Sequence, residues 1–192
     1  MYLFFDTETT GLPLAWNAPV GDLDNWPRMV QIAWLLYDNK ANKIKERNYI
    51  IKPEGFEIPA EASDVHGITT AIAYEKGKNL YDVLKEFYED LQETTCLVAH
   101  NISFDEMIVG AEFIRMNLET SQLLGCKRVC TMKASTNYCK IKKYRGYGYK
   151  WPRLDELHYH LFNEYFTGAH DALPDVEACA RCFFELKKRD II

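Results

Sequence analysis

Two carboxylates near the start of the chain, Asp6 and Glu8, have the spacing of a metal site. They follow the apolar run 2–5 (Tyr-Leu-Phe-Phe), which predicts a strand. In an extended segment, residues i and i+2 project from the same face, so both carboxylates can bind one hard cation. The alternative is that both side chains are solvated in a polar turn ending at Gly11. The pair by itself does not distinguish these interpretations.

A second acidic block follows another apolar run. Residues 96–99 (Cys-Leu-Val-Ala) predict a short buried strand that leads into a helix over 102–116. Asp105 therefore lies just past a strand end, where α/β folds place their chemistry.

A third block precedes the last helix of the chain. Residues 170–175 (His-Asp-Ala-Leu-Pro-Asp) open a pattern that predicts a helix over 172–188. Pro174 suits the first turn of a helix, because its missing N–H group would have no partner there. Asp175 and His170 thus lie at a helix start, and Asp171 is expected to cap the helix rather than to bind a ligand.

Taken in order, the three blocks resemble the signatures of the DnaQ-like 3′→5′ exonuclease superfamily, in its histidine (DEDDh) branch. The patterns are D-x-E-T-T-G, H-N-x-x-F-D and H-x-x-x-x-D, and the resemblance covers roughly residues 2–185. Residues 65–69 (Val-His-Gly-Ile-Thr) also resemble a segment common among proofreading members. The sister branch would carry a tyrosine four residues before the last aspartate, where this chain has Asp171.

The resemblance implies an α/β fold with a ribonuclease-H-like mixed five-stranded sheet flanked by helices, and residues 1–192 are expected to form a single exonuclease domain. Hydrophobic patterning is compatible with this fold. Strands are predicted over 2–5, 29–37, 44–51, 96–99 and 128–131, with a hairpin turning at 38–40. Helices are predicted over 79–93, 102–116, 153–162 and 172–188. Residues 12–28 are expected to form an ordered loop.

Phosphodiester hydrolysis needs a more basic water and neutralisation of charge on the leaving oxygen, and two metal ions can supply both. Mg²⁺ and Mn²⁺ favour oxygen ligands, which makes the four carboxylates a suitable set. The resemblance implies that Asp6 bridges two ions, that Glu8 and Asp175 hold the ion on the nucleophile side, and that Asp105 acts on the second ion through water.

The resemblance also implies that His170 is the general base. An imidazole with an ordinary pKa near 6.5 can accept a proton from water near neutral pH. The alternative is a surface histidine that caps a helix.

Residues directly after the first acidic pair contact the terminal nucleotide in related exonucleases. The substrate-side candidates are Thr9, Thr10, Gly11, Leu12, His66, Asn101 and Phe104. Two of them have other interpretations, since Phe104 can pack in the core and His66 can be a buried turn histidine.

Charge is distributed unevenly. The chain has a formal net charge of −5, yet residues 120–154 contain nine Lys or Arg and no acidic residue, which leaves −14 on the remainder. Five aromatic residues, Tyr138, Tyr144, Tyr147, Tyr149 and Trp151, are interleaved with these cations. Such a segment can hold phosphates while stacking bases and so guide a single strand toward the metals. The alternative is a solvated connector.

Six cysteines, at 96, 126, 130, 139, 179 and 182, do not form a dense disulfide pattern, so reduced thiols are expected. A zinc site from Cys126, Cys130, Cys179 and Cys182 is a weaker interpretation, because the last pair lies within a predicted helix.

A hydrophobic content of 47% supports one substantial core. No apolar stretch approaches a membrane span, and a cytoplasmic location is expected.

Three functions are compatible with the sequence. The leading one is an Mg²⁺- or Mn²⁺-dependent exonuclease, freestanding or associated with a polymerase or another replication or repair factor, that releases nucleoside monophosphates from single-stranded 3′ ends, with DNA favoured over RNA. The second is an RNA-trimming or oligoribonuclease-like enzyme. The third is a non-catalytic module that binds nucleic acid or a polymerase. A monomer and a homodimer are both compatible with the sequence.

Overall fold

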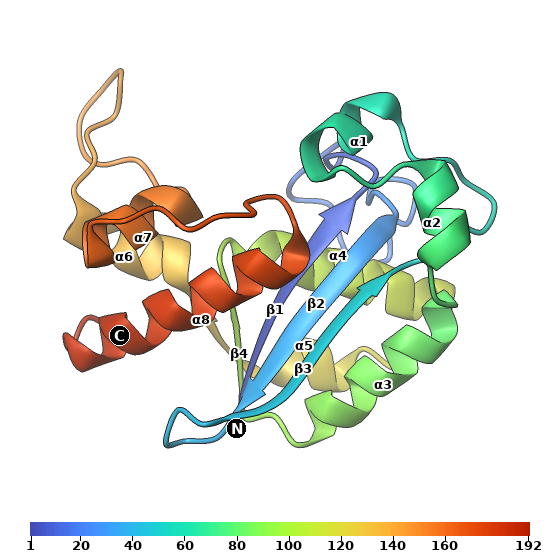
Figure 1. The fold of residues 1–192 in the computed structure, drawn as a ribbon, viewed down its shortest axis with the longest axis horizontal. Coiled ribbons are helices and arrows are strands. Elements are labelled where there is room, and N and C mark those ends of the chain that lie inside the picture. Colours follow the sequence, from blue (N-terminus) through green and yellow to red (C-terminus); the bar gives the residue numbers. More distant parts are fainter.

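The computed structural model describes all residues 1–192, which form one mixed sheet with helices on both faces (Figure 1). The strand order is β3-β2-β1-β4-β5, antiparallel from β3 to β1 and parallel from β1 to β5. The strands are β1 (Tyr2–Thr9), β2 (Met29–Tyr37), β3 (Lys43–Ile50), β4 (Cys96–Ala99) and β5 (Lys127–Cys130). The helices are α1 (Ala60–His66), α2 (Thr70–Lys76), α3 (Leu80–Gln92), α4 (Ile102–Arg115), α5 (Ser121–Gly125), α6 (Thr131–Cys139), α7 (Leu154–Phe162) and α8 (Ala172–Lys188).

The first half of the central strand β1, residues 2–5, is apolar on both faces because helices cover both. Leu3 and Phe5 belong to the larger core cluster, where Phe5 lies 5.8 Å from Phe87 of α3, measured between ring centroids. Phe4 points to the opposite face and packs on Phe183 of α8, with ring centroids 5.2 Å apart. The alternation of a strand therefore distributes one apolar run between two cores.

The mixed five-stranded sheet and all five predicted strands are confirmed. The main difference is that β1 continues through the acidic pair to Thr9. Backbone pairing with β2 extends it, since Asp6 lies opposite Ala33 and Glu8 opposite Gln31. An apolar pattern alone ends at Phe5, whereas ladder hydrogen bonds do not depend on side-chain polarity.

The four predicted helices are confirmed to within one residue at each end, but four further helices of five to nine residues were not predicted. These are α1, α2, α5 and α6. Helices this short give a weak periodic signal, and tertiary contacts decide whether they form. The basic segment 120–154 therefore is not one continuous connector, because it contains α5, β5 and α6.

The loop over residues 12–28 is ordered by a buried ionic network at α4. The Arg115 guanidinium donates hydrogen bonds to the backbone oxygens of Leu23 and Trp26, at 2.6 and 2.7 Å. Glu112, fully buried, accepts from Arg28 at 2.9 Å and from the backbone N–H of Met29 at 3.0 Å. These bonds fix the loop beside the end of β1, as expected for an ordered segment.

All six cysteines are free thiols. Cys179 and Cys182 are buried within α8 and pack in two different core clusters. None of the helices has the length and apolar character needed to cross a bilayer.

Candidate active site

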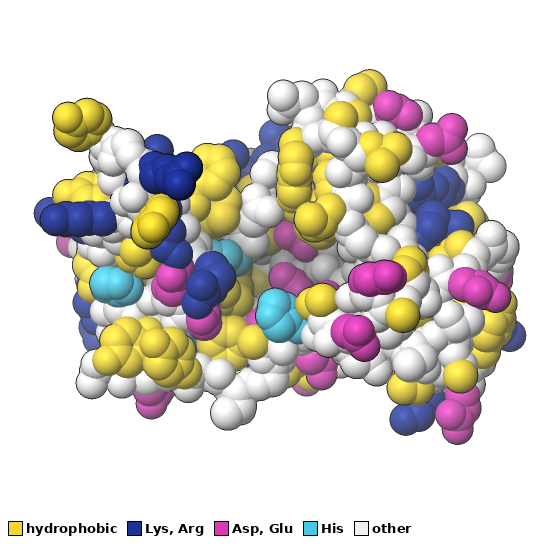
Figure 2. Space-filling view, turned by 90° about the horizontal axis from the view of Figure 1, so that it is seen from above, with side chains coloured by type: hydrophobic (Ala, Val, Ile, Leu, Met, Phe, Trp, Pro, Cys, Tyr) yellow, Lys and Arg dark blue, Asp and Glu magenta, His cyan; other side chains and the backbone are white.

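Three carboxylates converge where the carboxyl-terminal half of β1 meets the start of α8. Carboxylate oxygens of Asp6, Glu8 and Asp175 lie within 4.8 Å of one another. Asp6 and Glu8 project from the same face of β1, and α8 crosses that face with Asp175 in its first turn. Acidic side chains line the floor of the central hollow seen from above (Figure 2). The spacing predicted from the sequence thus becomes a compact oxygen site.

Asp105 lies outside this triplet and approaches from α4. Its Oδ1 accepts hydrogen bonds from the backbone N–H of Thr7 at 3.0 Å and from the Thr7 hydroxyl at 2.8 Å. Thr7 lies between Asp6 and Glu8 and points to the other face of β1, so it joins the strand to α4. Sequence reasoning missed this positioning role, although the alternation of the strand places Thr7 on that face.

Burial raises the pKa values of all four acids, and for Asp6, Glu8 and Asp105 the charges of other acids in the site add to this effect. The pKa of Asp6 lies well above its ordinary value, first because of burial and then because of the Asp105 charge. Burial, followed by the Asp175 charge, raises the pKa of Glu8 to about 8. Burial also raises the pKa of Asp105 to about 7, against the opposing Thr7 hydrogen bonds, and that of Asp175 to about 6. The metal-free site therefore retains protons near neutral pH.

The donor set fits hard divalent cations. All four side chains offer carboxylate oxygens, the ligands that Mg²⁺ and Mn²⁺ prefer. A positive charge at the triplet would offset the repulsion that raises these pKa values. Asp6, Glu8, Asp175 and Asp105 are thus the residues that could hold the metal ions.

His170 borders the acidic site with its ring exposed. Its backbone is left-handed, with φ of 68°, and the backbone N–H of His170 donates to Asp175 Oδ2 at 3.0 Å. A hollow of about 170 Å³ next to it is lined by His170, Asp175, Arg153 and Asp155 among others. The side chain that caps α8 is Asp171 and not His170.

Gln31 of β2 fixes the start of α8. Its Nε2 donates to Asp171 Oδ1 at 2.8 Å, and its Oε1 accepts from the Ala172 backbone N–H at 3.3 Å. Gln31 is buried and lies opposite Glu8 in the sheet register. This contact between β2 and α8 holds the segment that carries His170, and no local sequence signal indicates it.

A cleft of about 490 Å³ opens beside Glu8 on the side of α1. Most of the predicted substrate-side residues line it: Thr9, Thr10, Gly11, Leu12, His66 and Phe104. Asn101 is not among the lining residues. It immediately precedes α4 with a left-handed backbone, and its Oδ1 accepts from the Ser103 hydroxyl. Phe104 also packs against Trp16, with ring centroids 5.8 Å apart. Its two interpretations, packing and cleft lining, therefore coexist.

The second wall of this cleft comes from α1 and the residue before it, which sequence reasoning missed. Pro59, Glu61, Ala62 and Val65 line it. Only the fold brings residues 59–66 opposite residues 9–12.

The sheet order and the acidic site define a ribonuclease-H-like fold of the exonuclease type. Exonuclease I of E. coli in complex with a dT13 oligonucleotide superposes with a TM-score of 0.78, covering 98% of this chain and 41% of that chain at 22% identity. Exonuclease I from Methylocaldum szegediense gives a TM-score of 0.76, over 98% of this chain and 40% of that chain, also at 22% identity. The chain belongs to the exonuclease family whose model, RNase_T, matches residues 3–183.

Similar sequences occur within much longer polymerases. The DNA polymerase III PolC-type of Streptococcus sanguinis is 35% identical over 117 residues, which are 61% of this chain and 7% of the polymerase. That of Streptococcus pneumoniae is 30% identical over 187 residues, covering 95% of this chain and 11% of the polymerase. The chain therefore spans about a tenth or less of the length of these relatives.

Proposed function

We propose that this chain is a metal-dependent 3′→5′ exonuclease of the DEDDh type, which removes nucleoside 5′-monophosphates from the 3′ end of single-stranded DNA. The observation that carries the proposal is the triplet Asp6, Glu8 and Asp175, with Asp105 and His170 beside it. Membership of the exonuclease family supports the same reaction class. Residues 1–192 would act as one exonuclease domain.

Two divalent ions, when bound, supply a more basic water and neutralise charge on the leaving oxygen. Asp6, Glu8 and Asp175 would hold them, with Asp105 completing the set. Thr7 fixes the Asp105 carboxylate with two hydrogen bonds, so this acid needs little reorganisation.

His170 would accept the proton from the attacking water. Its ring is exposed at the edge of the acidic site, and its backbone is tied to Asp175. The proton can then pass to solvent from this exposed position.

The substrate-side cleft supports a reaction at a strand end. It adjoins Glu8 and is lined by Leu12 and Phe104, which offer apolar surface for a base, while the backbone of Thr9 and Thr10 borders the same space. The 3′-terminal nucleotide would occupy it. Single-stranded DNA is the favoured polymer, because the similar Exonuclease I structure is a complex with dT13 and the similar sequences are DNA polymerases. A bacterial-type replication or repair role in the cytoplasm would agree with these similarities.

The test is a denaturing-gel time course with 5′-labelled single-stranded DNA and RNA of the same sequence, in Mg²⁺, Mn²⁺ and EDTA. The wild type should give a ladder that shortens from the 3′ end only with metal, and Asp6→Ala should give none. Glu89→Ala removes an exposed carboxylate of α3 and should behave like the wild type. Faster cleavage of RNA would assign the chain to RNA trimming, and no cleavage of either polymer would contradict the proposal.

A further inference from the structure

A hairpin over residues 140–150, here called the basic hairpin, projects from the lobe formed by α6 and α7 (Figure 1). An antiparallel bridge joins Lys142 to Tyr149, and the Lys150 N–H donates to the Ile141 carbonyl at 2.8 Å. Gly146, with φ of 82°, permits the tight turn at its tip. Backbone bonds thus close the hairpin at its base, and its tip projects into solvent.

Among the cations of the basic hairpin, only Lys150 at its base has an acidic partner. Lys150 binds Glu156 at 2.6 Å and secures the hairpin to α7. The four exposed cations without a carboxylate within ion-pair distance are Lys140, Lys142, Lys143 and Arg145. In a chain with a net charge of −5, this is a local positive surface that attracts an anion.

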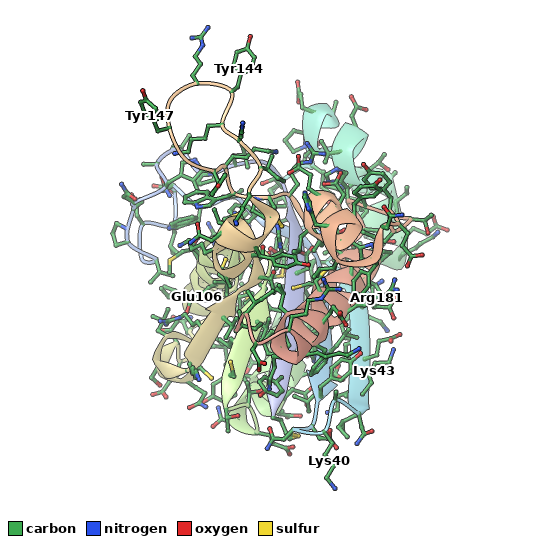
Figure 3. All side chains as sticks on the ribbon, turned by 90° about the vertical axis from the view of Figure 1, so that its left-hand side faces the viewer. Lys40, Lys43, Glu106, Tyr144, Tyr147 and Arg181 are labelled. Carbon is green, nitrogen blue, oxygen red and sulfur yellow. The ribbon has the colours of Figure 1, made fainter.

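The aromatic side chains at the tip do not pack on the protein. Tyr144 is 97% exposed and Tyr147 is 101% exposed. Figure 3 shows both rings at the extremity of the molecule, far from Lys40 in the β2–β3 turn. Two fully solvated rings contribute nothing to a core, and they remain free to stack on another planar group.

The base of the hairpin is fixed next to the acidic site. His100 Nε2 donates to the carbonyl of Pro152 at 3.0 Å, which ties the segment after the hairpin to the end of β4. Arg153 then borders the hollow that also contains His170 and Asp175. Lys and Arg side chains gather on this side of the central hollow, opposite the lobe that bears α1 (Figure 2). A strand whose 3′ end lies in the cleft beside α1 can therefore extend past His170 toward the hairpin.

We propose that the basic hairpin binds the single strand on the 5′ side of the scissile bond and so makes the enzyme prefer long single-stranded substrates. Lysines and Arg145 would contact phosphates, while Tyr144 and Tyr147 would stack on bases. Stacking on both rings needs unpaired bases, which a duplex does not offer. This inference rests on the proposed exonuclease function for its catalytic consequence, although binding itself can be measured without hydrolysis.

The experiment uses two double variants. One combines Lys142→Gln and Lys143→Gln, and the other combines Tyr144→Ala and Tyr147→Ala. The control is Lys40→Gln with Lys85→Gln, which removes two exposed cations from the β2–β3 turn and from α3, elements that lie away from the hairpin (Figure 1). Substrates are a labelled single strand of about 20 nucleotides, long enough to span a single-strand groove, the matching blunt duplex, and the p-nitrophenyl ester of thymidine 5′-monophosphate. Binding is measured by fluorescence anisotropy in EDTA, and hydrolysis in Mg²⁺.

The lysine double variant should bind the single strand about tenfold more weakly, with the slope of log K against log salt reduced by up to about 1.4. The tyrosine double variant should lose single-strand affinity while retaining its salt slope and its weak duplex affinity. Both should hydrolyse the small ester like the wild type, and the control should match the wild type throughout. Unchanged single-strand affinity and KM in both hairpin variants would overturn the inference. Absence of wild-type hydrolysis with intact hairpin-dependent binding would instead overturn the exonuclease proposal.

Discussion

Glu8 gives the most quantitative prediction, which concerns the protein without metal. Its pKa rises from an ordinary 4.5 to about 8 on folding, first because of burial and then because of the Asp175 charge. The folded state thus binds a proton that the unfolded state releases, and the free energy of unfolding falls as pH rises between these two values. The contribution is fully retained below pH 4.5 and fully lost above about pH 8.

The magnitude follows from the pKa difference. One pKa unit corresponds to about 1.4 kcal/mol, and pH 7 lies about 2.5 units above the ordinary pKa of Glu8, so the free energy of unfolding falls by at most about 3.5 kcal/mol between pH 4.5 and pH 7. For a domain of this size, that equals at most about 7 to 14 °C in Tm. Glu8→Gln cannot ionise and should escape the loss.

The assay is thermal unfolding in EDTA between pH 4.5 and 8.5. The two proteins should have similar Tm values at the acidic end, and Glu8→Gln should become increasingly more stable as pH rises. Millimolar Mg²⁺ should then raise the Tm of the wild type more than that of the variant, because an ion that binds only the folded state stabilises it. A Tm difference that does not change with pH would refute the reasoning.

Three further substitutions test the positioning of the site. Thr7→Val removes the hydroxyl donor to Asp105 and should cost about 1.5 to 3 kcal/mol of unfolding free energy and lower kcat, with KM little changed; unaltered kcat would contradict the role of Thr7. His170→Gln should abolish hydrolysis yet keep the Mg²⁺-induced rise in Tm, and retained activity would exclude His170 as the base. Arg115→Leu leaves Glu112 with fewer partners and should destabilise the protein by about 3 to 5 kcal/mol, as measured by urea unfolding; a change below about 1 kcal/mol would show that the network does not hold the loop.

Much of the sheet was predictable because its signals are local. Phe4 and Phe5 alternate between two cores, and this produces an apolar run that the sequence displays directly. The long helices α3, α4 and α8 are also marked by periodic apolar residues and by start signals such as Pro174. The short helix α1 has no such signal, and its place opposite residues 9–12 follows from packing alone.

Within the candidate site, the residue types and their spacing were visible in the sequence, since Asp6 and Glu8 on one strand must share a face. The resemblance to the exonuclease family, which the family match confirms, connected them with Asp105 and Asp175. The roles of these acids and of His170 stay predictions. Thr7 could have been identified by strand alternation, whereas Gln31 acts through a contact with Asp171 that joins residues 140 positions apart.

The sequence by itself determined which chemistry to expect, because carboxylates suited to hard cations, a histidine and an apolar strand are properties of residue types at short spacing. Only the tertiary structure decided how close the carboxylates lie, how far their pKa values rise, and which cations remain without partners. These quantities depend on distance and burial between distant segments. Arg128 and Lys142 belong to the same basic stretch, yet Arg128 is neutralised by Glu106 of α4 while Lys142 projects into solvent on the hairpin. Composition does not reveal which residues are neighbours in space. These neighbours decide whether a cation is held in an ion pair or is free to bind a nucleic acid.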